Sequence, residues 1–333
     1  MSKIKYLINR IIKMNYARMF KVTKNISKKK NKNYLLVLLD IIVCGIKYGA
    51  GYLDYELFEM YNLNNEQRKT YLTRTKNNEF IKNYNKKDFI KYFDNKVLFN
   101  KKFKQFLKRE FIYLEEITQK EAIKWIEDRT LFVAKIIDGS CGKGIKRIDT
   151  SEYSSTIELY NFLLSNNYFL LEEMVYQHEK LDMLHSCSVN TIRLVTITNN
   201  NTVYYVGSFL RIGNGSFVDN LNSGGMSSPV DINTGIIQYP AADKLGKVYY
   251  KHPLTNVDIV GFKIPFWDEA KALVESAAFI VPEIRYVGWD VAITKDGPVF
   301  IEANPFPGYD IYQLPVHTPN KIGVLPRYWA VEK

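Results

Sequence analysis

Two short segments decide the fold of this chain, Gly288-Trp289-Asp290 and Glu302-Ala303-Asn304-Pro305. Apolar residues follow Asp290 and precede Glu302, and Lys295-Asp296-Gly297 between them is a turn signal. The pattern predicts two neighbouring strands paired as a hairpin. A strand projects residues i and i+2 to the same face, so Glu302 and Asn304 point together.

The donor atoms of this hairpin suit a metal ion. Pairing across the turn can bring Asp290 to the side of Glu302 and Asn304, where two carboxylates and an amide oxygen converge. Mg²⁺ prefers such oxygen ligands and shares its shell with water and phosphates. A solvated polar hairpin is the alternative. The apolar residues around the three donors favour a buried strand pair instead, in which carboxylates need a charge partner.

A glycine-rich segment upstream is a candidate for binding an anion. Lys135 lies in the apolar run 131–137, and Asp138-Gly-Ser-Cys-Gly-Lys-Gly144 follows it. Glycines permit positive φ and let successive backbone N–H groups face an anion. A Walker-type phosphate loop is disfavoured, because strand-like sequence rather than a helix follows Gly144. A plain loop remains the alternative.

The segment Leu171-Glu172-Glu173-Met174-Val175 reads as the end of a strand. A strand that ends in this way can act as a hinge whose backbone groups bond adenine while Met174 packs on the ring. Taken alone, this pattern is weak.

Composition and charge limit the function classes. The hydrophobic fraction of 46% and charged fraction of 24% are ordinary for a globular protein. Cys44, Cys141 and Cys187 are few and widely spaced, which suits a reducing cytoplasm. The net charge of +11 matches the eleven Lys and Arg that precede the first acid, Asp40. A nucleic-acid-binding protein would spread its basic residues over the folded surface, so that class is disfavoured.

The basic N-terminus allows two interpretations. Apolar residues recur at helical spacing there (Ile4, Leu7, Ile8, Ile11 and Ile12) with lysine and arginine between them. Such a helix either packs on the rest of the protein or lies on an anionic membrane surface through residues 1–32. The apolar segment 34–46 is too short to span a bilayer and contains Asp40, so we predict a buried helix there. A secretory signal is not expected.

The remaining chain predicts a mixed fold. Residues 1 to about 93 read as helices, and a further helix is expected near 153–165. Strands are expected at 168–171 and at 189–198 and 202–212, the last two joined by Asn199-Asn200-Asn201. An amphipathic helix follows at 268–281. Because strands come as hairpins, the fold class is α+β with mainly antiparallel strands.

These motifs, in this order, resemble the ATP-grasp superfamily, and most closely its sugar-transfer-associated branch. Further matching stretches are Ser188-Val-Asn190-Thr191-Ile-Arg193, Asn222-Ser-Gly-Gly225 and His252-Pro253. The resemblance implies an ATP-grasp fold, in which two α+β subdomains clasp ATP, preceded by the helical region 1–93. The ATP-grasp domain would span 94–333, with a lid at about 127–176 and a metal-binding subdomain at about 186–333.

The resemblance also implies roles for individual residues. The metal ligands would be Asp290, Glu302 and Asn304, holding Mg²⁺, with Mn²⁺ as an alternative. The middle segment also resembles peptide-forming ATP-grasp ligases, which implies that the catalytic side chains Arg193, Arg211 and Asn222 face the acyl phosphate or the γ-phosphate. A surface ion pair is the alternative for each arginine. The ATP-binding residues would be Lys96, Lys135, Ser140, Gly142, Gly144, Glu172, Glu173, Met174 and Val175. Gly224-Gly225 either lets the backbone approach the substrate or only turns the chain, and His252 is expected to be structural.

The implied activity is that of an ATP-dependent carboxylate–amine ligase working through an acyl phosphate, in cell-surface polysaccharide assembly. Its partners would be ATP, a carboxylate and an amine or sugar-linked acceptor, with no nucleic acid. We expect it in the cytoplasm, with the inner face of the membrane as a peripheral site. An ATP-dependent phosphotransferase acting on a sugar or small molecule is one alternative. A non-catalytic ATP-binding partner of a glycosyltransferase complex is another.

Overall fold

The computed structural model describes residues 14–137 and 144–331. The chain forms two compact units. Unit 1 comprises Met1–Glu79 with Gln313–Pro326, and unit 2 comprises Phe80–Tyr312 with Arg327–Lys333.

Unit 1 is helical, which confirms the predicted N-terminal helical region. Asparagine caps define the first two helices of its described part: the Asn15 side chain accepts from Arg18 N, and that of Asn33 from Leu35 N. Asn31 and Gly49 end these helices in the left-handed conformation. The elements are α2 (Tyr16–Lys30), α3 (Tyr34–Tyr48), α4 (Tyr52–Leu57), η1 (Met60–Asn62), α5 (Asn65–Lys69), the start of α6 (Arg74–Tyr84), η5 (Pro315–His317) and the start of α14 (Leu325–Trp329).

A segment from far along the chain completes unit 1. The buried Gln313 side chain accepts from Leu72 N at 3.1 Å and donates to Leu72 O at 2.7 Å. Thr70 Oγ1 accepts from Gly323 N at 2.8 Å. These bonds fasten 313–326 to 70–72, so this unit is built from two separate stretches of sequence.

Helix α3 corrects one prediction. Val37, Ile41, Cys44 and Tyr48 are buried as expected, but the opposite side of the helix lies in solvent. That side consists of Leu35, Leu36, Leu39, Ile42, Val43 and Ile46, each between 45% and 70% exposed. Apolar residues lie on all sides of α3, but the described parts of unit 1 cover only one side of this helix.

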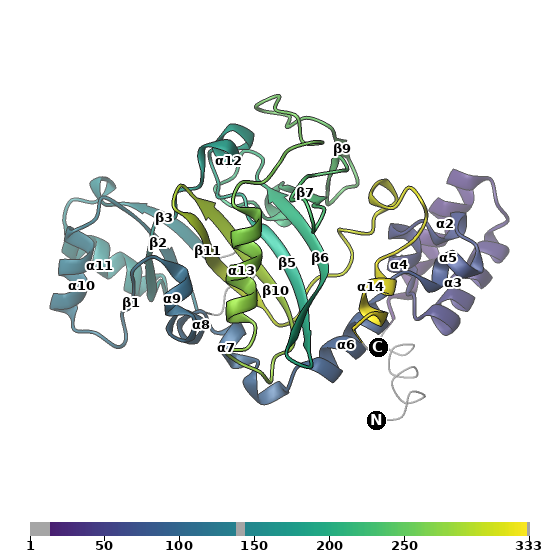
Figure 1. Ribbon diagram of the computed structural model, residues 1–333. Helices are drawn as coiled ribbons and strands as arrows, with labels where there is room; N and C mark the ends of the chain where they lie inside the picture. Colours follow the sequence, from purple (N-terminus) through teal and green to yellow (C-terminus); the bar gives the residue numbers. More distant parts are fainter. Residues whose placement is uncertain (1–13, 138–143, 332–333) are drawn as a thin grey trace. The chain divides into compact units, whose positions relative to one another are not determined.

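Unit 2 contains a four-stranded antiparallel sheet in the order β1-β4-β2-β3. Its strands are β1 (Phe111–Tyr113), β2 (Leu131–Lys135), β3 (Ile145–Asp149) and β4 (Leu170–Glu173). Helices α10 (Gln119–Glu127) and α11 (Thr156–Ser165) lie beside this sheet (Figure 1). A compact core around Trp125, Phe132 and Leu163 joins helices and sheet. The expected strand at 168–171 begins two residues later.

The second sheet of unit 2 has seven antiparallel strands in the order β11-β10-β5-β6-β7-β8-β9. Its strands are β5 (Ile192–Asn199), β6 (Thr202–Ile212), β7 (Met226–Pro229), β8 (Ala241–Asp243), β9 (Val248–Tyr249), β10 (Tyr286–Thr294) and β11 (Gly297–Asn304). Helix α13 (Trp267–Ala277) lies across one face (Figure 1). Short helices α7 (Lys91–Asp94), α8 (Lys96–Lys102), α9 (Lys104–Leu107) and α12 (Glu179–Leu184) complete the unit.

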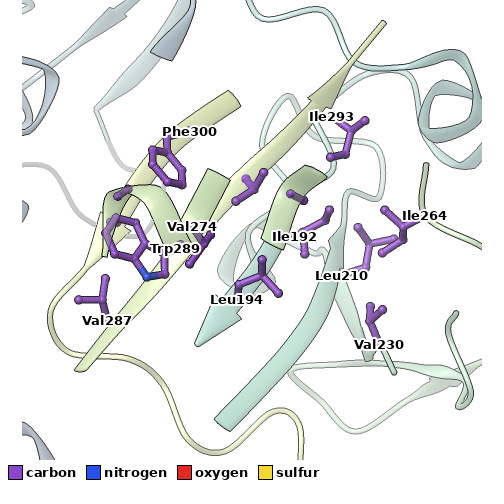
Figure 2. Close-up of a cluster of buried hydrophobic side chains, with 14 of the residues drawn as sticks. Ile192, Leu194, Leu210, Val230, Ile264, Val274, Val287, Trp289, Ile293 and Phe300 are labelled. Atoms are coloured by element: carbon purple, nitrogen blue, oxygen red, sulfur yellow. The ribbon is translucent and has the colours of Figure 1, made fainter. Parts of the chain in front are cut away.

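The core of this second sheet fixes the two hairpins that matter for the site. Ile192, Leu194 and Leu210 of β5 and β6 gather with Trp289 of β10 and Phe300 of β11 (Figure 2). Asn200 and Asn201 adopt φ of 46° and 57°, and Gly297 adopts 103°, as tight hairpin turns require. Both predicted hairpins and the mainly antiparallel α+β class are confirmed.

No helix in the described part of the chain is long and apolar enough to cross a membrane.

Candidate active site

A cleft in unit 2 gathers charged side chains from both of its sheets. Lys135, Glu172 and Glu173 of the four-stranded sheet line it, as do Met174 and Val175, which directly follow β4. From the seven-stranded sheet, Arg211, Asp290 and Glu302 line it. Eight of the predicted site residues therefore share one cavity.

Glu172 anchors the first charged cluster. Its side chain is 2% exposed on β4, and one carboxylate oxygen accepts from both Lys135 Nζ and Arg109 Nε at 2.8 Å. The other accepts from Asn100 Nδ2, also at 2.8 Å. Arg109 further donates to the carbonyl oxygens of Phe300 at 2.5 Å and Ile301 at 3.3 Å.

The electrostatics of this cluster favour full ionisation. Burial by itself would raise the pKa of Glu172, but Arg109 and Lys135 outweigh it and lower the pKa to about 2. Lys135 is thus a charged group held in one place by an ionised partner. Glu172 belongs to the predicted hinge segment, and its side chain also holds the lysine in place.

The chain leaves the sheet directly after Glu173. The Glu173 N–H donates to Glu110 O at 3.0 Å, and its carboxylate accepts from Arg129 Nη2 at 2.9 Å. A backbone contact from Glu173 to a ligand would therefore use its carbonyl oxygen. Met174 and Val175 follow as irregular chain along the cleft wall.

Asp290 anchors the second charged cluster, on β10. It is 1% exposed and bridges two arginines of the neighbouring hairpin. Arg193 binds it through Nε and, at 2.6 Å, through Nη2. Arg211 Nη1 binds it at 2.6 Å, and Arg211 Nη2 reaches Asp219 at 3.4 Å. Burial raises the pKa of Asp290, but the two guanidiniums prevail and hold it below its usual value.

Glu302 lies directly across the strand pair from Asp290. A β-bulge between Asp290 and Val291 shifts the register at this point, and Asp290 pairs with Glu302. Their carboxyl groups share a hydrogen bond. Glu302 is closely surrounded by protein yet remains solvent-exposed through the cleft. This confinement, together with the Asp290 carboxylate, raises the pKa of Glu302.

The chemistry of this donor set fits a divalent cation. Two carboxylates in contact repel each other, so one of them keeps a proton unless a cation binds between them. Asn304 follows on the same strand, and its Oδ1 accepts from Phe306 N at 2.7 Å. Among the described residues, no group of three His, Cys, Asp or Glu side chains forms a metal cluster. A metal at this position would thus depend on two carboxylates with the amide and water.

Five predicted residues of the described chain lie outside the cleft lining, namely Asn304 and four others. Arg193 reaches the cleft only through Asp290. Lys96 Nζ donates to Ile137 O at 3.0 Å. The exposed Asn222 side chain accepts from Lys244 Nζ at 2.6 Å. Gly144 has φ +74° and accepts from Ile136 N at 2.9 Å, closing the base of its loop.

Two predicted loop residues, Ser140 and Gly142, lie outside the described residues.

Several cleft residues were missed. Arg109 stands in the polar stretch 108–110, which gives no sign of a site. Asp219 lies in a loop, and its carboxylate accepts from the backbone N of Thr191 at 2.9 Å and from the Thr191 hydroxyl at 2.5 Å. Burial raises the pKa of Asp219, and Arg211 opposes that effect. Only the place of Asp219 just after the Arg211 strand could have drawn attention to it.

The structure shows the contacts of Gly224, Gly225 and His252, for which the sequence allowed more than one role. A Cβ on Gly225 would lie 2.4 Å from Asp219 O, so this glycine lets its loop close upon itself. Gly224 adopts φ +91° and turns the chain. The buried His252 bonds Gly213 O through Nε2 at 2.8 Å and accepts from Leu254 N at 3.3 Å. These contacts are those of a structural histidine.

Comparison with known proteins gives one extended sequence match. The family described as sugar-transfer associated ATP-grasp matches residues 75–333. No curated protein matches the chain.

Solved structures of ATP-grasp type are similar at low identity. N5-carboxyaminoimidazole synthetase from Staphylococcus aureus, complexed with ADP, is 16% identical over 66% of this chain and 46% of its own, with a TM-score of 0.40. The L-amino acid ligase from Bacillus licheniformis is 12% identical over 65% and 42%, with 0.37. The ATP-grasp ligase PsnB, complexed with a precursor variant, Mg and ADP, is 11% identical over 74% and 62%, with 0.42. The chain thus spans about half of the length of these proteins.

Proposed function

Since the chain belongs to the sugar-transfer associated ATP-grasp family, we propose that it is an ATP-dependent carboxylate–amine ligase. A carboxylate oxygen of the first substrate attacks the γ-phosphorus of ATP, which releases ADP and leaves an acyl phosphate. The amine nitrogen of the second substrate then attacks the acyl carbon, and inorganic phosphate leaves with the bonding electron pair.

The observation that carries this proposal is the opposition of two charged clusters across one cleft. On one wall, Lys135 is fixed by Glu172. On the other, Arg211 stands beside the Asp290–Glu302 pair. Phosphoryl transfer needs positioned positive charge around the phosphates more than covalent chemistry from the protein. Lys135 and Arg211 would provide that charge from opposite sides.

Mg²⁺, or Mn²⁺ in its place, would be held by Asp290, Glu302 and Asn304 and would neutralise phosphate charge when bound. Arg193 has a positioning role in this scheme, since its guanidinium bonds Asp290 and Arg193 is not among the residues that line the cleft. The adenine would lie against Met174 and Val175, with the Glu173 carbonyl as an acceptor. Lys96, Ser140, Gly142, Gly144 and Asn222 complete the proposed set around the phosphates and acceptor.

The setting belongs to the proposal too. We place the enzyme in the cytoplasm, in the assembly or modification of a cell-surface polysaccharide, because of its family. Peripheral contact with the inner face of the membrane through residues 1–32 is also proposed. The amphipathic pattern at residues 4–12, which suggests this membrane contact, lies outside the described residues.

Nucleotide turnover tests the function directly. The protein is incubated with ATP, Mg²⁺ and pools of amino acids and sugars, and ADP, phosphate and products are measured by coupled assay and mass spectrometry. We expect ADP release that requires both an acid and an amine. Phosphate appearing on a sugar would instead identify a phosphotransferase, and calorimetry showing no ATP binding would refute both activities.

A pair of lysine variants makes the test specific to the cleft. Lys135→Met removes the cation beside Glu172, whereas Lys120→Met removes an exposed lysine on α10. The first should lower ATP affinity at least tenfold and the second should not change it. Equal effects would contradict the placement of the phosphates.

A further inference from the structure

The outward face of α3 is a continuous apolar surface. Leu35, Leu39, Ile42 and Ile46 follow one another at spacings of four, three and four residues, and so form one stripe along the helix. Leu36 and Val43 lie beside that stripe, seven residues apart. All six side chains are exposed, up to 70% for Ile46. A contiguous exposed patch of this kind marks an interaction site on a soluble protein.

The acid within this helix does not oppose contact with an anionic surface. Asp40 accepts from Arg68 through both carboxylate oxygens at 2.7 Å, and from the Tyr55 hydroxyl at 2.7 Å. Arg68 and Tyr55 outweigh partial burial and lower the pKa of Asp40, so the carboxylate stays ionised and neutralised inside unit 1. Within α3, the outward face therefore carries no free carboxylate.

Lysines bracket the apolar face. Lys32 precedes Leu35 by three residues, and the exposed Lys47 follows Ile46 directly. The preceding helix, α2, exposes Lys21, Lys24, Lys28 and Lys29, and its sequence contains no acid. An apolar stripe flanked by cations is the pattern that inserts at the boundary between lipid headgroups and acyl chains.

The net positive charge of the chain is also concentrated in unit 1, which contains α3. Unit 1 contains 17 Lys and Arg against 6 Asp and Glu, a net charge of +11. Unit 2 contains 29 of each and is formally neutral. The whole positive excess of the chain therefore belongs to the unit that exposes the apolar helix, which argues for an anionic bilayer over an uncharged partner as the occupant.

We propose that the outward face of α3 docks on an anionic phospholipid surface. Leu35, Leu39, Ile42 and Ile46 enter the interface, and the flanking lysines contact lipid phosphates. The helix lies in the plane of the surface, since its 15 residues are too few to span it. The apolar part of this surface lies outside residues 1–32, to which membrane contact was assigned above, whereas the flanking lysines of α2 and Lys32 belong to that tail. The proposal is independent of the proposed enzymatic activity.

Vesicle sedimentation of the full chain tests the proposal. Vesicles of phosphatidylcholine with about one third phosphatidylglycerol, the class of composition to which a basic amphipathic face responds, are compared with phosphatidylcholine alone. We expect binding to the anionic vesicles that weakens with salt. The double substitution Leu39→Gln and Ile46→Gln should lower that binding at least tenfold while leaving ATP binding unchanged.

A matched double variant controls for lost apolar surface in general. Leu245→Gln and Leu254→Gln change two leucines of unit 2, which are 93% and 64% exposed. This variant should bind vesicles like the unmodified protein. Thermal unfolding of both variants checks that the fold is retained.

Three results would overturn the proposal. The first is the absence of binding to anionic vesicles, and the second is equal binding by the two double variants. The third is self-association without lipid, measured by sedimentation velocity, that only the α3 variant abolishes. That last outcome would identify a second copy of the chain as the occupant.

Discussion

The cleft of unit 2 and the α3 surface of unit 1 place charged and apolar side chains in opposite ways. Unit 2 buries charged residues in pairs, with Glu172 between Lys135 and Arg109, and Asp290 between Arg193 and Arg211. Unit 1 exposes apolar residues along α3 and carries all of the net charge.

Both arrangements oppose folding. A buried ion costs several kcal/mol of desolvation, and an exposed leucine forgoes roughly 2 kcal/mol of burial. A protein keeps such features where something else supplies the missing contacts. The comparison therefore indicates two separate binding surfaces, one for a charged ligand in the cleft and one for an apolar, anionic surface on α3.

The sharpest test of the cleft is Asp290→Asn. We expect turnover to fall by about 10³-fold, since the change removes a carboxylate proposed to bind metal. Stability should fall as well, by about 3 kcal/mol, because two buried arginines lose their shared counter-charge. ADP release and urea unfolding measure the two effects.

Two further substitutions separate the effect on turnover from the effect on stability. Glu302→Gln should match the loss of turnover with a smaller loss of stability, since burial and the Asp290 carboxylate both oppose the charged form of Glu302 and raise its pKa. The exposed Asp268→Asn on α13 should change neither quantity. If both cleft variants lost stability and kept turnover, the buried charges would be core pairs and the comparison would fail.

Glu172→Gln is expected to act next most strongly. It leaves Lys135 and Arg109 buried without a counter-ion, and should destabilise the fold on the order of 3 kcal/mol and weaken ATP binding at least tenfold. The pH dependence is also specific. A carboxyl whose folded pKa lies below 4.5 stabilises above pH 4.5 and loses that contribution as pH falls toward about 2.

Urea unfolding at pH 6 and pH 3 checks this sign. The stability gap between the unmodified protein and Glu172→Gln should narrow at pH 3. A stability gap of the same size at pH 6 and pH 3 would show that the ionised Glu172 carboxylate does not stabilise the fold through Lys135 and Arg109.

Metal affinity should depend on pH through Glu302, with a smaller effect. Its pKa is raised above 4.5, so the carboxyl must lose a proton before it can bind a cation. The Mn²⁺ dissociation constant, measured by electron paramagnetic resonance, should rise about tenfold per pH unit below that pKa. The rise should begin above pH 4.5 and be absent from Glu302→Gln; a constant affinity down to pH 4.5 would argue against Glu302 as a ligand.

Hydrogen exchange should give the smallest but most direct contrast between the units. ATP with Mg²⁺ should slow exchange in β2, in β4 with its hinge, and in β10 and β11, and leave α3 unaffected. Anionic vesicles should do the reverse. Protection of both regions by either ligand alone would break the separation of the two surfaces.

Much of the fold followed from local pattern. Alternating and β-branched residues around Asn199–Asn201 and Lys295–Gly297 indicated both hairpins, because turn residues and strand period act over a few positions. The side to which Asp290 points depended on a β-bulge, which no sequence pattern marked. The pairing of Glu172 with Arg109, 63 residues away, is a tertiary contact that local pattern cannot predict.

The error at α3 has a different origin. Hydropathy measures how apolar a segment is, and α3 is apolar on every side. Whether a given side of α3 is covered depends on how many other helices pack against it, and the composition of the segment does not reveal that number. Asp40 argued correctly against a membrane-spanning helix. Because Asp40 pairs with Arg68, however, it adds no free carboxylate to the exposed face of α3.

The hydrogen bonds between residues 313–326 and 70–72 have a consequence for biosynthesis. A ribosome releases residues 1–79 long before residues 313–326 exist. Because these two segments of unit 1 are separated by most of unit 2, the bonds between them can form only when nearly all of the chain has emerged. Until then unit 1 is incomplete, and the apolar face of α3 would be open to chaperones or a membrane while synthesis continues.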